Sequence, residues 1–452
     1  MATAVLDRFA LPPAGKIRPF HFPPFLRRRL PNGLEVLASR QDGVPLISVE
    51  MVVPAGAQHD PEGKAGLATL TASVIDEGTR RRNSLEIAAQ IEQLGGYLTT
   101  GADWDEGYFA TGLLSKHRRA GLELIAEVLN EPTFPEHEVE RLRKQRLTEI
   151  LRRRHDPAAL AEEKLNEVIY QGTVFANPLI GTAESTQALG RSALVDFYER
   201  HYTRDGAALI AVGDLDPEEL LREAEALFGE VKAPSRPAPE IRPTRLDGVS
   251  IHIIDRPGAP QTELRLGHAG VARPDPDYIP LILVNTLLGG KFTSRINMNL
   301  RERHAYTYGA STRFVARRGP GPFIVDAAVA TESAGAATAE VLFELRKIRE
   351  EPMEVQELEE TRSYIIGVFP YTFQTIGEVA KRLETLAVHG LPDDYYDRYL
   401  EQLASLTREG LLEVARRHIH PDHIAVVAVG PADALTPQFE GMGEIRVWPR
   451  PA

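Results

Sequence analysis

The sequence LGGKFTSR at residues 288–295, followed by NLRERHAYTY at residues 299–308, predicts a helix end, a second short helix and a strand. Apolar residues recur at helical spacing up to the glycine pair, which indicates a helix that ends there. Glycine permits backbone angles that a helix interior forbids, so the pair is expected to supply the break. The next helix is predicted to bury Ile296 and Leu300 and to end near Arg303.

Residues 306–314 alternate as in a strand, so Tyr308, Ala310 and Thr312 are expected on one face. Arg301 at the helix end and Tyr308 near the strand start then place two hydrogen-bond donors at one spot. Spacing alone also fits a structural role. An arginine in a last helical turn often caps carbonyl groups, and a tyrosine entering a strand often keeps only its hydroxyl at the rim of the core.

The composition excludes several classes of protein. The chain has 452 residues, of which 43% are hydrophobic, so it can form sizeable cores, and its length suggests about three domains. A net charge of −12 argues against a nucleic-acid-binding surface. The chain has no cysteine, which excludes disulfides and thiolate metal sites.

The N-terminal 25 residues contain charged and proline residues that interrupt any apolar run of signal-peptide length. No stretch of the sequence approaches the roughly 18–20 apolar residues of a membrane span. We therefore expect a soluble, cytoplasmic protein without a membrane partner.

The second half of the chain repeats the order of elements of the first half. A proline-rich stretch at residues 233–246 is predicted to be a semi-rigid linker. It separates an N-terminal lobe, residues 26–232, from a C-terminal lobe, residues 247–450. Each half follows the order strand, helix, two strands, helices and strand, which predicts an α+β fold of two homologous lobes. Each lobe is expected to hold a mainly antiparallel sheet with helices packed on one face.

The motif Leu-Gly-Gly-x-x-x-Ser-Arg, then Leu-Arg-Glu and Tyr308, resembles the C-terminal half of the pitrilysin-type (inverted-zincin) metallopeptidases. The resemblance implies a two-lobed fold like that of the mitochondrial processing peptidases in that family. It also implies that Arg301 and Tyr308 bind the scissile carbonyl of a peptide substrate. Gly289 and Gly290 are expected to bring the backbone close to the substrate.

Arg295 and Glu302 also match the family's motif and are expected to act as structural partners of the second helix. Arg301 suits the binding of a carbonyl oxygen because its charge is permanent and its guanidinium group is planar.

The family's zinc motif, H-x-x-E-H, is missing from its expected helix. The metal positions fall on Thr69, Ala72 and Ser73, although Glu149 matches the family's distal glutamate ligand. One carboxylate cannot hold a catalytic zinc ion, which takes three protein ligands. No histidine elsewhere has the spacing to rebuild the site, and His418 and His420, two residues apart, would point to different sides of a helix. We therefore expect this chain to bind no catalytic metal.

The resemblance implies the non-zinc subunit of a heterodimeric metallopeptidase, inactive alone. A homologous partner with H-x-x-E-H would hold the zinc and its activated water. Arg301 and Tyr308 would stabilise the carbonyl oxygen as negative charge develops. Two alternatives stay open: a scaffold subunit of a larger assembly, like the core proteins of a respiratory complex, and a metal-free homodimer that binds peptides.

Overall fold

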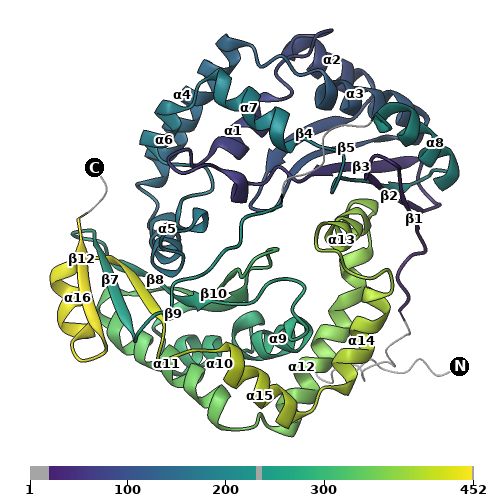
Figure 1. The fold of residues 1–452 in the computed structure, drawn as a ribbon. Coiled ribbons are helices and arrows are strands. Elements are labelled where there is room, and N and C mark those ends of the chain that lie inside the picture. The colour runs from purple at the N-terminus through teal and green to yellow at the C-terminus, as the bar shows by residue number, and fades with distance from the viewer. Residues whose placement is uncertain (1–19, 231–236, 450–452) are drawn as a thin grey trace, which may run out of the picture.

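The computed structural model describes residues 20–230 and 237–449. Two six-stranded sheets, one from each half of the chain, lie on opposite sides of the molecular centre (Figure 1). The first sheet is antiparallel except where β2 and β6 pair in parallel. Its spatial order is β1 (Leu26–Arg29), β2 (Glu35–Arg40), β6 (Ala208–Gly213), β3 (Leu46–Val53), β5 (Gly107–Leu114) and β4 (Tyr97–Ala102).

The second sheet repeats this arrangement strand by strand. Its order is β12 (Glu444–Trp448), β7 (Ser250–Asp255), β11 (Ala425–Gly430), β8 (Gln261–Ala269), β10 (Pro322–Ala330) and β9 (Thr307–Phe314). Only the outermost strand differs, because β1 pairs antiparallel with β2 whereas β12 pairs parallel with β7. The α+β fold with a mainly antiparallel sheet in each half is confirmed. β4 and β9 are equivalent edge strands.

Most helices cover the outer faces of the sheets, and one helix of each half packs on an inner face (Figure 1). Those of the first half are α1 (Leu67–Val74), α2 (Ser84–Gln93), α3 (Arg118–Asn130), α4 (Glu136–Arg153), α5 (Pro157–Ile169), α6 (Ala183–Ala188), α7 (Arg191–His201) and α8 (Pro217–Phe228). Those of the second half are α9 (Tyr278–Asn285), α10 (Arg295–Asn297), α11 (Ala334–Glu350), α12 (Val355–Val368), α13 (Ile376–Val388), α14 (Tyr395–Ser405), α15 (Arg408–His418) and α16 (Ala432–Phe439).

One helix of each half packs on the inner face of the other half's sheet. α5 packs on β8 and β11 of the second sheet, and α13 packs on β3 and β6 of the first (Figure 1). Leu165 and Ile169 of α5 share a buried cluster with Val427. The expectation of helices on one face only was therefore incomplete. In the chain, α5 follows the long helix α4, and α13 follows α12. At the start of α5, Asp156 accepts the backbone N–H of Ala158 at 3.0 Å.

A second contact joins the halves through a buried arginine. Arg317 lies over the rings of Trp104, Phe175 and Tyr170, with centroid distances of 4.6, 4.5 and 5.8 Å. The Tyr170 hydroxyl donates to the carbonyl of Pro320 at 2.8 Å. An aromatic surround of this kind stabilises a cation that has been removed from water.

The predicted lobe boundaries, 26–232 and 247–450, stay a prediction. Residues 231–236, where the predicted linker begins, lie outside the described residues. Residues 237–249 contain neither helix nor strand. Within the described ranges, no helix is long and apolar enough to cross a membrane.

Candidate functional site

The segment that carries Arg301 folds largely as its sequence predicts. α9 ends in a π-helical turn, Thr286–Gly290, and the short α10 continues into a second one, Met298–Arg303. Ile296 and Leu300 are buried at 0% and 1% exposure and anchor this second helix to the core. Arg301 therefore projects from the last turn before the strand.

The glycine pair does not supply the unusual backbone angles that the sequence predicted. Neither Gly289 nor Gly290 has a positive φ, so backbone freedom does not explain them. A Cβ on Gly289 would lie 2.4 Å from the Thr312 hydroxyl on β9, and one on Gly290 would lie 3.1 Å from the Asn285 side-chain nitrogen. Gly289 is needed because the helix end packs directly against the strand.

Tyr308 departs from the predicted alternation. Thr307 pairs with Val329 and Ala310 pairs with Ala327, so two residues of β9 oppose a single residue of β10. This β-bulge turns Tyr308 away from the buried face: it is 89% exposed, whereas Ala310 is 8% exposed. The prediction that both share one face was wrong, because an extra residue shifts the parity. Bulges often re-aim a side chain beside a functional site.

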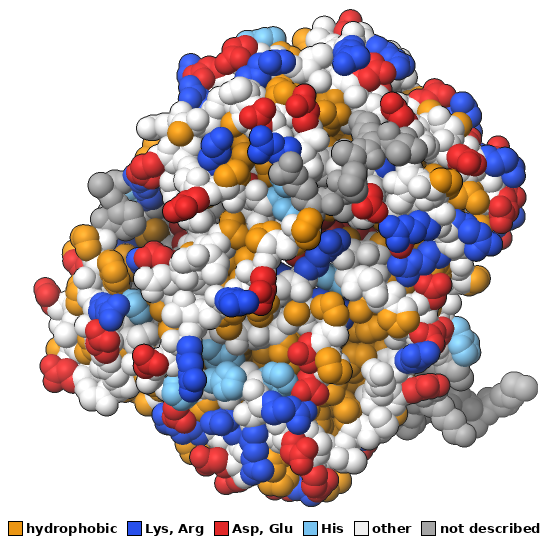
Figure 2. All heavy atoms as spheres, viewed as in Figure 1, with side chains coloured by type: hydrophobic (Ala, Val, Ile, Leu, Met, Phe, Trp, Pro, Cys, Tyr) orange, Lys and Arg blue, Asp and Glu red, His pale blue; other side chains and the backbone are white. Residues whose placement is uncertain are grey.

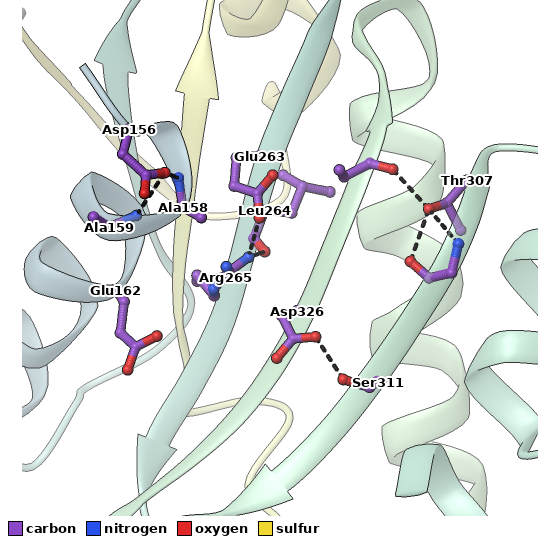
Figure 3. Close-up of polar contacts among 12 residues, drawn as sticks. Asp156, Ala158, Ala159, Glu162, Glu263, Leu264, Arg265, Thr307, Ser311 and Asp326 are labelled. Atoms are coloured by element: carbon purple, nitrogen blue, oxygen red, sulfur yellow. Dashed lines mark hydrogen bonds and ion pairs between the residues drawn. The ribbon is translucent and has the colours of Figure 1, made fainter. Parts of the chain in front are cut away.

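Hydrogen bonds from Thr307 hold the bulge in place. Its hydroxyl lies 2.6 Å from the carbonyl oxygen of Ala328, the residue opposite the bulge, and accepts the N–H of Gly309 at 3.1 Å (Figure 3). The exposed direction of Tyr308 is therefore fixed by local backbone geometry.

Arg301 and Tyr308 line the same open pocket, which has a volume of about 440 Å³. The Arg301 guanidinium lies 4.6 Å from the Phe292 ring centroid, and its Nε lies 3.3 Å from a Glu302 carboxylate oxygen. The Tyr308 hydroxyl makes no hydrogen bond to any described residue. The pocket is also lined by Gly289, Gly290, Lys291, Asn297, Asp326 and Tyr364. Sequence reasoning missed Phe292 and Tyr364, which carry no motif of their own.

Polar contacts link the lining of this pocket to α5, the first-half helix that packs on the second sheet. The Ser311 hydroxyl donates to Asp326 at 2.5 Å across β9 and β10 (Figure 3). Asp326 also forms an ion pair with Arg313, which bonds to Glu162 on α5 at 3.0 Å. Arg295, in contrast, points away from the pocket and binds Glu357 of α12 through two bonds of 2.7 and 2.6 Å. Arg301 is thus available for a ligand while Arg295 has a structural contact.

The positions of the family's zinc ligands contain a guanidinium group instead of a metal site. Thr69 and Ser73 lie one turn apart on α1, and Arg146 reaches them from α4. Its Nη1 donates to the Thr69 hydroxyl at 2.8 Å and to the carbonyl of Ile180 at 3.2 Å, and its Nη2 donates to the Ser73 hydroxyl at 3.2 Å. Burial lowers the pKa of Arg146. The space therefore already holds an internal cation.

Glu149 does not take part in this arrangement. It lies near the surface of α4 and forms two bonds of 2.8 Å with Arg152. The Arg152 guanidinium lowers the pKa of Glu149. Ala72, at the position of the family's general base, is 1% exposed and offers no ligand atom. Two hydroxyls, a methyl and a guanidinium do not fit a zinc ion.

Sequence reasoning did not identify one group of potential metal ligands. Asp275, Asp277 and His418 have ligand atoms within 4.8 Å of one another, the one such group in the described ranges. Asp277 already pairs with His418 at 2.7 Å and with Arg417 at 2.8 Å. The carboxylate is thus compensated by protein groups, and we assign no ion to it.

Comparison with known proteins agrees with this geometry. Residues 36–183 match the model for insulinase (peptidase family M16), and residues 188–365 match the model for the peptidase M16 inactive domain. Together these matches cover well over half of the chain, which belongs to the M16 peptidase family. The predicted pitrilysin-type family is confirmed.

Named relatives include both proteases and processing subunits. An uncharacterized zinc protease of Rickettsia bellii is 24% identical over 75% of this chain and 81% of that protein. The mitochondrial-processing peptidase subunit beta of Bos taurus is 28% identical over 58% of this chain, and the match spans 53%, about half, of that subunit.

Solved structures show the same fold along nearly the whole chain. A peptidase M16 inactive domain from Pseudomonas fluorescens is 25% identical, with a TM-score of 0.84 over 90% of this chain and 98% of that one. A protease from Helicobacter pylori is 18% identical, with a TM-score of 0.84 over 91% and 100% of the two chains.

Proposed function

We propose that this chain is the zinc-less subunit of a two-chain M16 peptidase, in which Arg301 and Tyr308 bind the scissile carbonyl of a peptide. The observation that supports this most is their placement in one open pocket, on two different elements. The absence of a fitting zinc site around Arg146 in the described residues supports a division of labour. The catalytic metal and its water would then belong to a homologous partner with H-x-x-E-H.

Within this proposal, Arg301 and Tyr308 act as hydrogen-bond donors to the carbonyl oxygen. The Tyr308 hydroxyl is solvent-exposed and has no protein partner among the described residues, so binding a carbonyl breaks no internal hydrogen bond. Among the described residues, the one ion pair of Arg301 is with exposed Glu302 at 3.3 Å, and its guanidinium lies against Phe292 at the pocket wall. Such donors stabilise the negative charge that develops on the oxygen during attack.

The edge strand β9 supplies a natural track for the peptide. Among the described strands, β9 pairs with β10 alone. On its other edge, the Ala310 N–H already donates to Asn297 at 3.0 Å and the Thr312 carbonyl accepts from Asn285 at 3.1 Å, so an added strand would pair near Tyr308. Peptides often bind by extending a sheet edge. A peptide on this edge would pass Tyr308 at the bulge, where ladder pairing is interrupted.

The test is peptide hydrolysis by this chain mixed with an H-x-x-E-H subunit. Arg301→Ala and Tyr308→Phe should each reduce turnover by about 10²–10³-fold, as expected for the loss of one such donor. Each should leave assembly with the partner unchanged, measured by size-exclusion chromatography. Arg303→Ala and Tyr371→Phe are matched controls, because both residues are exposed and neither lines the pocket.

Turnover within twofold of the wild type in both pocket variants would refute the assignment. Co-purification separates the remaining alternatives: subunits of a membrane complex would indicate a scaffold, and self-association with peptide binding but no hydrolysis would indicate a homodimer.

A further inference from the structure

A second cavity, of about 400 Å³, lies at the seam between the two halves. Gly33, Val52 and Ala208 line it from the first half, and Pro274, Arg318 and His389 line it from the second. The volume falls within the range of small-ligand pockets. In the space-filling view, basic, acidic and histidine side chains all lie along the region between the two lobes (Figure 2). Most of the remaining lining residues are small or apolar, apart from Arg29 and Glu35.

The Arg318 guanidinium forms no close ion pair in this cavity with any described residue. Its backbone N–H donates to Asp105 at 2.9 Å, which fixes the residue. Its guanidinium, however, makes no hydrogen bond or ion pair with any described residue, and Nε is buried without a partner. The nearby Asp105 accepts its hydrogen bond from the backbone; burial raises the pKa of Asp105 to about 6, and the charge of the Arg318 guanidinium opposes this shift. Arg318 as a whole is half-buried, and its buried Nε–H is a donor that a ligand acceptor would satisfy.

His389 presents a second unsatisfied group to the same cavity. It follows the last turn of α13, where its backbone N–H bonds to the carbonyl of Thr385 at 3.2 Å. Its ring Nδ1 is buried and has no hydrogen-bond partner among the described residues. Burial, with Arg273 and Arg318 nearby, lowers the pKa of His389 to about 3, so the ring is neutral and can donate one hydrogen bond.

The other charged residues of the lining already have partners. Arg29 pairs with Asp205 at 3.0 Å, and Glu35 pairs with Arg27 at 2.8 Å. Neither leaves a free anion for Arg318. The cavity therefore combines a guanidinium that forms no close ion pair with a described residue, a neutral imidazole and mainly apolar walls.

We propose that this cavity binds the C-terminal carboxylate of a peptide held between the lobes, through Arg318 and His389. The planar guanidinium matches a carboxylate, and the apolar walls suit the last side chain of the peptide. The proposal rests on the proposed function in one respect, that peptides enter the space between the lobes. It does not depend on hydrolysis or on the partner subunit.

The test measures binding to the isolated full-length chain by fluorescence anisotropy. Two N-terminally labelled peptides of one apolar sequence are compared, one with a free C-terminal carboxylate and one with a C-terminal amide. The carboxylate form should bind about tenfold more tightly, as expected for one charge-assisted hydrogen bond. Arg318→Met and His389→Asn should each remove most of this preference. Arg28→Met is the matched control, because Arg28 is exposed and bonds only to the carbonyl of Arg27.

Equal affinity for the two peptides would overturn the proposal, as would a preference that survives Arg318→Met in a protein that melts like the wild type. Inorganic phosphate is added in a separate arm. Stabilisation by phosphate that needs Arg318, with equal peptide affinities, would assign the site to a small free anion and overturn the peptide assignment. A carboxylate preference together with hydrolysis that is insensitive to Arg301 would leave this site standing while refuting the proposed function.

Discussion

Replacing Glu50 by glutamine should make the protein more stable at alkaline pH. Glu50 on β3 and Glu106 just before β5 face Glu384 on α13, the helix that the second half lends to the first sheet. Glu106 and Glu384 are 5% and 3% exposed. The hydrogen-bonded cation of this group is Lys381, which donates to Glu384 at 2.6 Å. Three buried carboxyl groups around one lysine cannot all be ionised at low cost.

The pKa values show which groups keep their protons. Burial, followed by the charge of Glu384, raises the pKa of Glu50 to about 8 and raises that of Glu106 well above its usual value. The pKa of Glu384 is lowered: burial opposes this, but hydrogen bonds from Glu106, Glu50 and Lys381 outweigh it. We infer that Glu50 and Glu106 are carboxylic acids that donate to an ionised Glu384 at neutral pH.

The sign of the pH effect follows from proton linkage. The folded state holds the Glu50 proton to a higher pH than the unfolded chain does, so the stabilisation is complete below the unfolded pKa, near 4.5, and is lost as pH rises through about 8. Integrating the linkage relation between pH 6.5 and 9 gives a loss of about 2 kcal/mol for this group. For one-step unfolding of 452 residues, that loss lowers Tm by about 2 °C.

The assay is urea or thermal unfolding of wild type and Glu50→Gln at several pH values from 6.5 to 9. Glutamine keeps the shape and can still donate to Glu384, but it has no proton to lose. The wild type should therefore lose about 2 kcal/mol more than the variant across this range. Titrating groups outside the cluster of Glu50, Glu106 and Glu384 act equally in both proteins and cancel. Glu123→Gln is the matched control, because that side chain is 52% exposed. Parallel pH profiles for wild type and Glu50→Gln would refute the proton assignment.

Two further predictions concern arginines that join separate elements. The double variant Thr69→His, Ser73→His should bind zinc weakly, because the Arg146 guanidinium repels the metal from that space. Adding Arg146→Ala should raise the zinc affinity at least tenfold, measured by zinc titration against a chelating dye. Equal affinities would contradict the placement of Arg146. Arg317→Ala should lower the free energy of unfolding by about 2 kcal/mol or more, measured in urea, because it empties the aromatic surround that joins the halves; Arg317→Lys should cost less, and no loss in either variant would contradict this role.

The sequence predicts the local features of this chain well. Helix periodicity and the buried Ile296 and Leu300 depend on neighbours a few residues apart, so both appear in the sequence pattern. The internal repeat predicts two equivalent sheets for the same reason. Arg301 and Tyr308 were found because a motif links them, and the structure brings them to one pocket.

Features that depend on distant residues were not predictable in this way. The bulge at Tyr308 results from the pairing of β9 with β10 and from the hydrogen bonds of Thr307, neither of which alters the alternation of the sequence. Arg146 lies 73 residues from Ser73, and nothing in its own helix distinguishes it from neighbouring surface arginines. The exchange of α5 and α13 likewise requires knowledge of which sheet each helix meets.

The two halves differ in which residue joins the equivalent pair of helices. In the first half, the cation between the early helix and the long helix is Arg146, which fills the space where the family binds its metal. In the second half, the equivalent tie is made beside the pocket, by Arg295 to Glu357 and by Lys291 to Thr361 at 2.8 Å. Because Arg295 and Lys291 make the contacts that join the helices, Arg301 is not needed for them. The first half therefore has an arginine side chain in this space, whereas the second half has an open pocket that a ligand can enter.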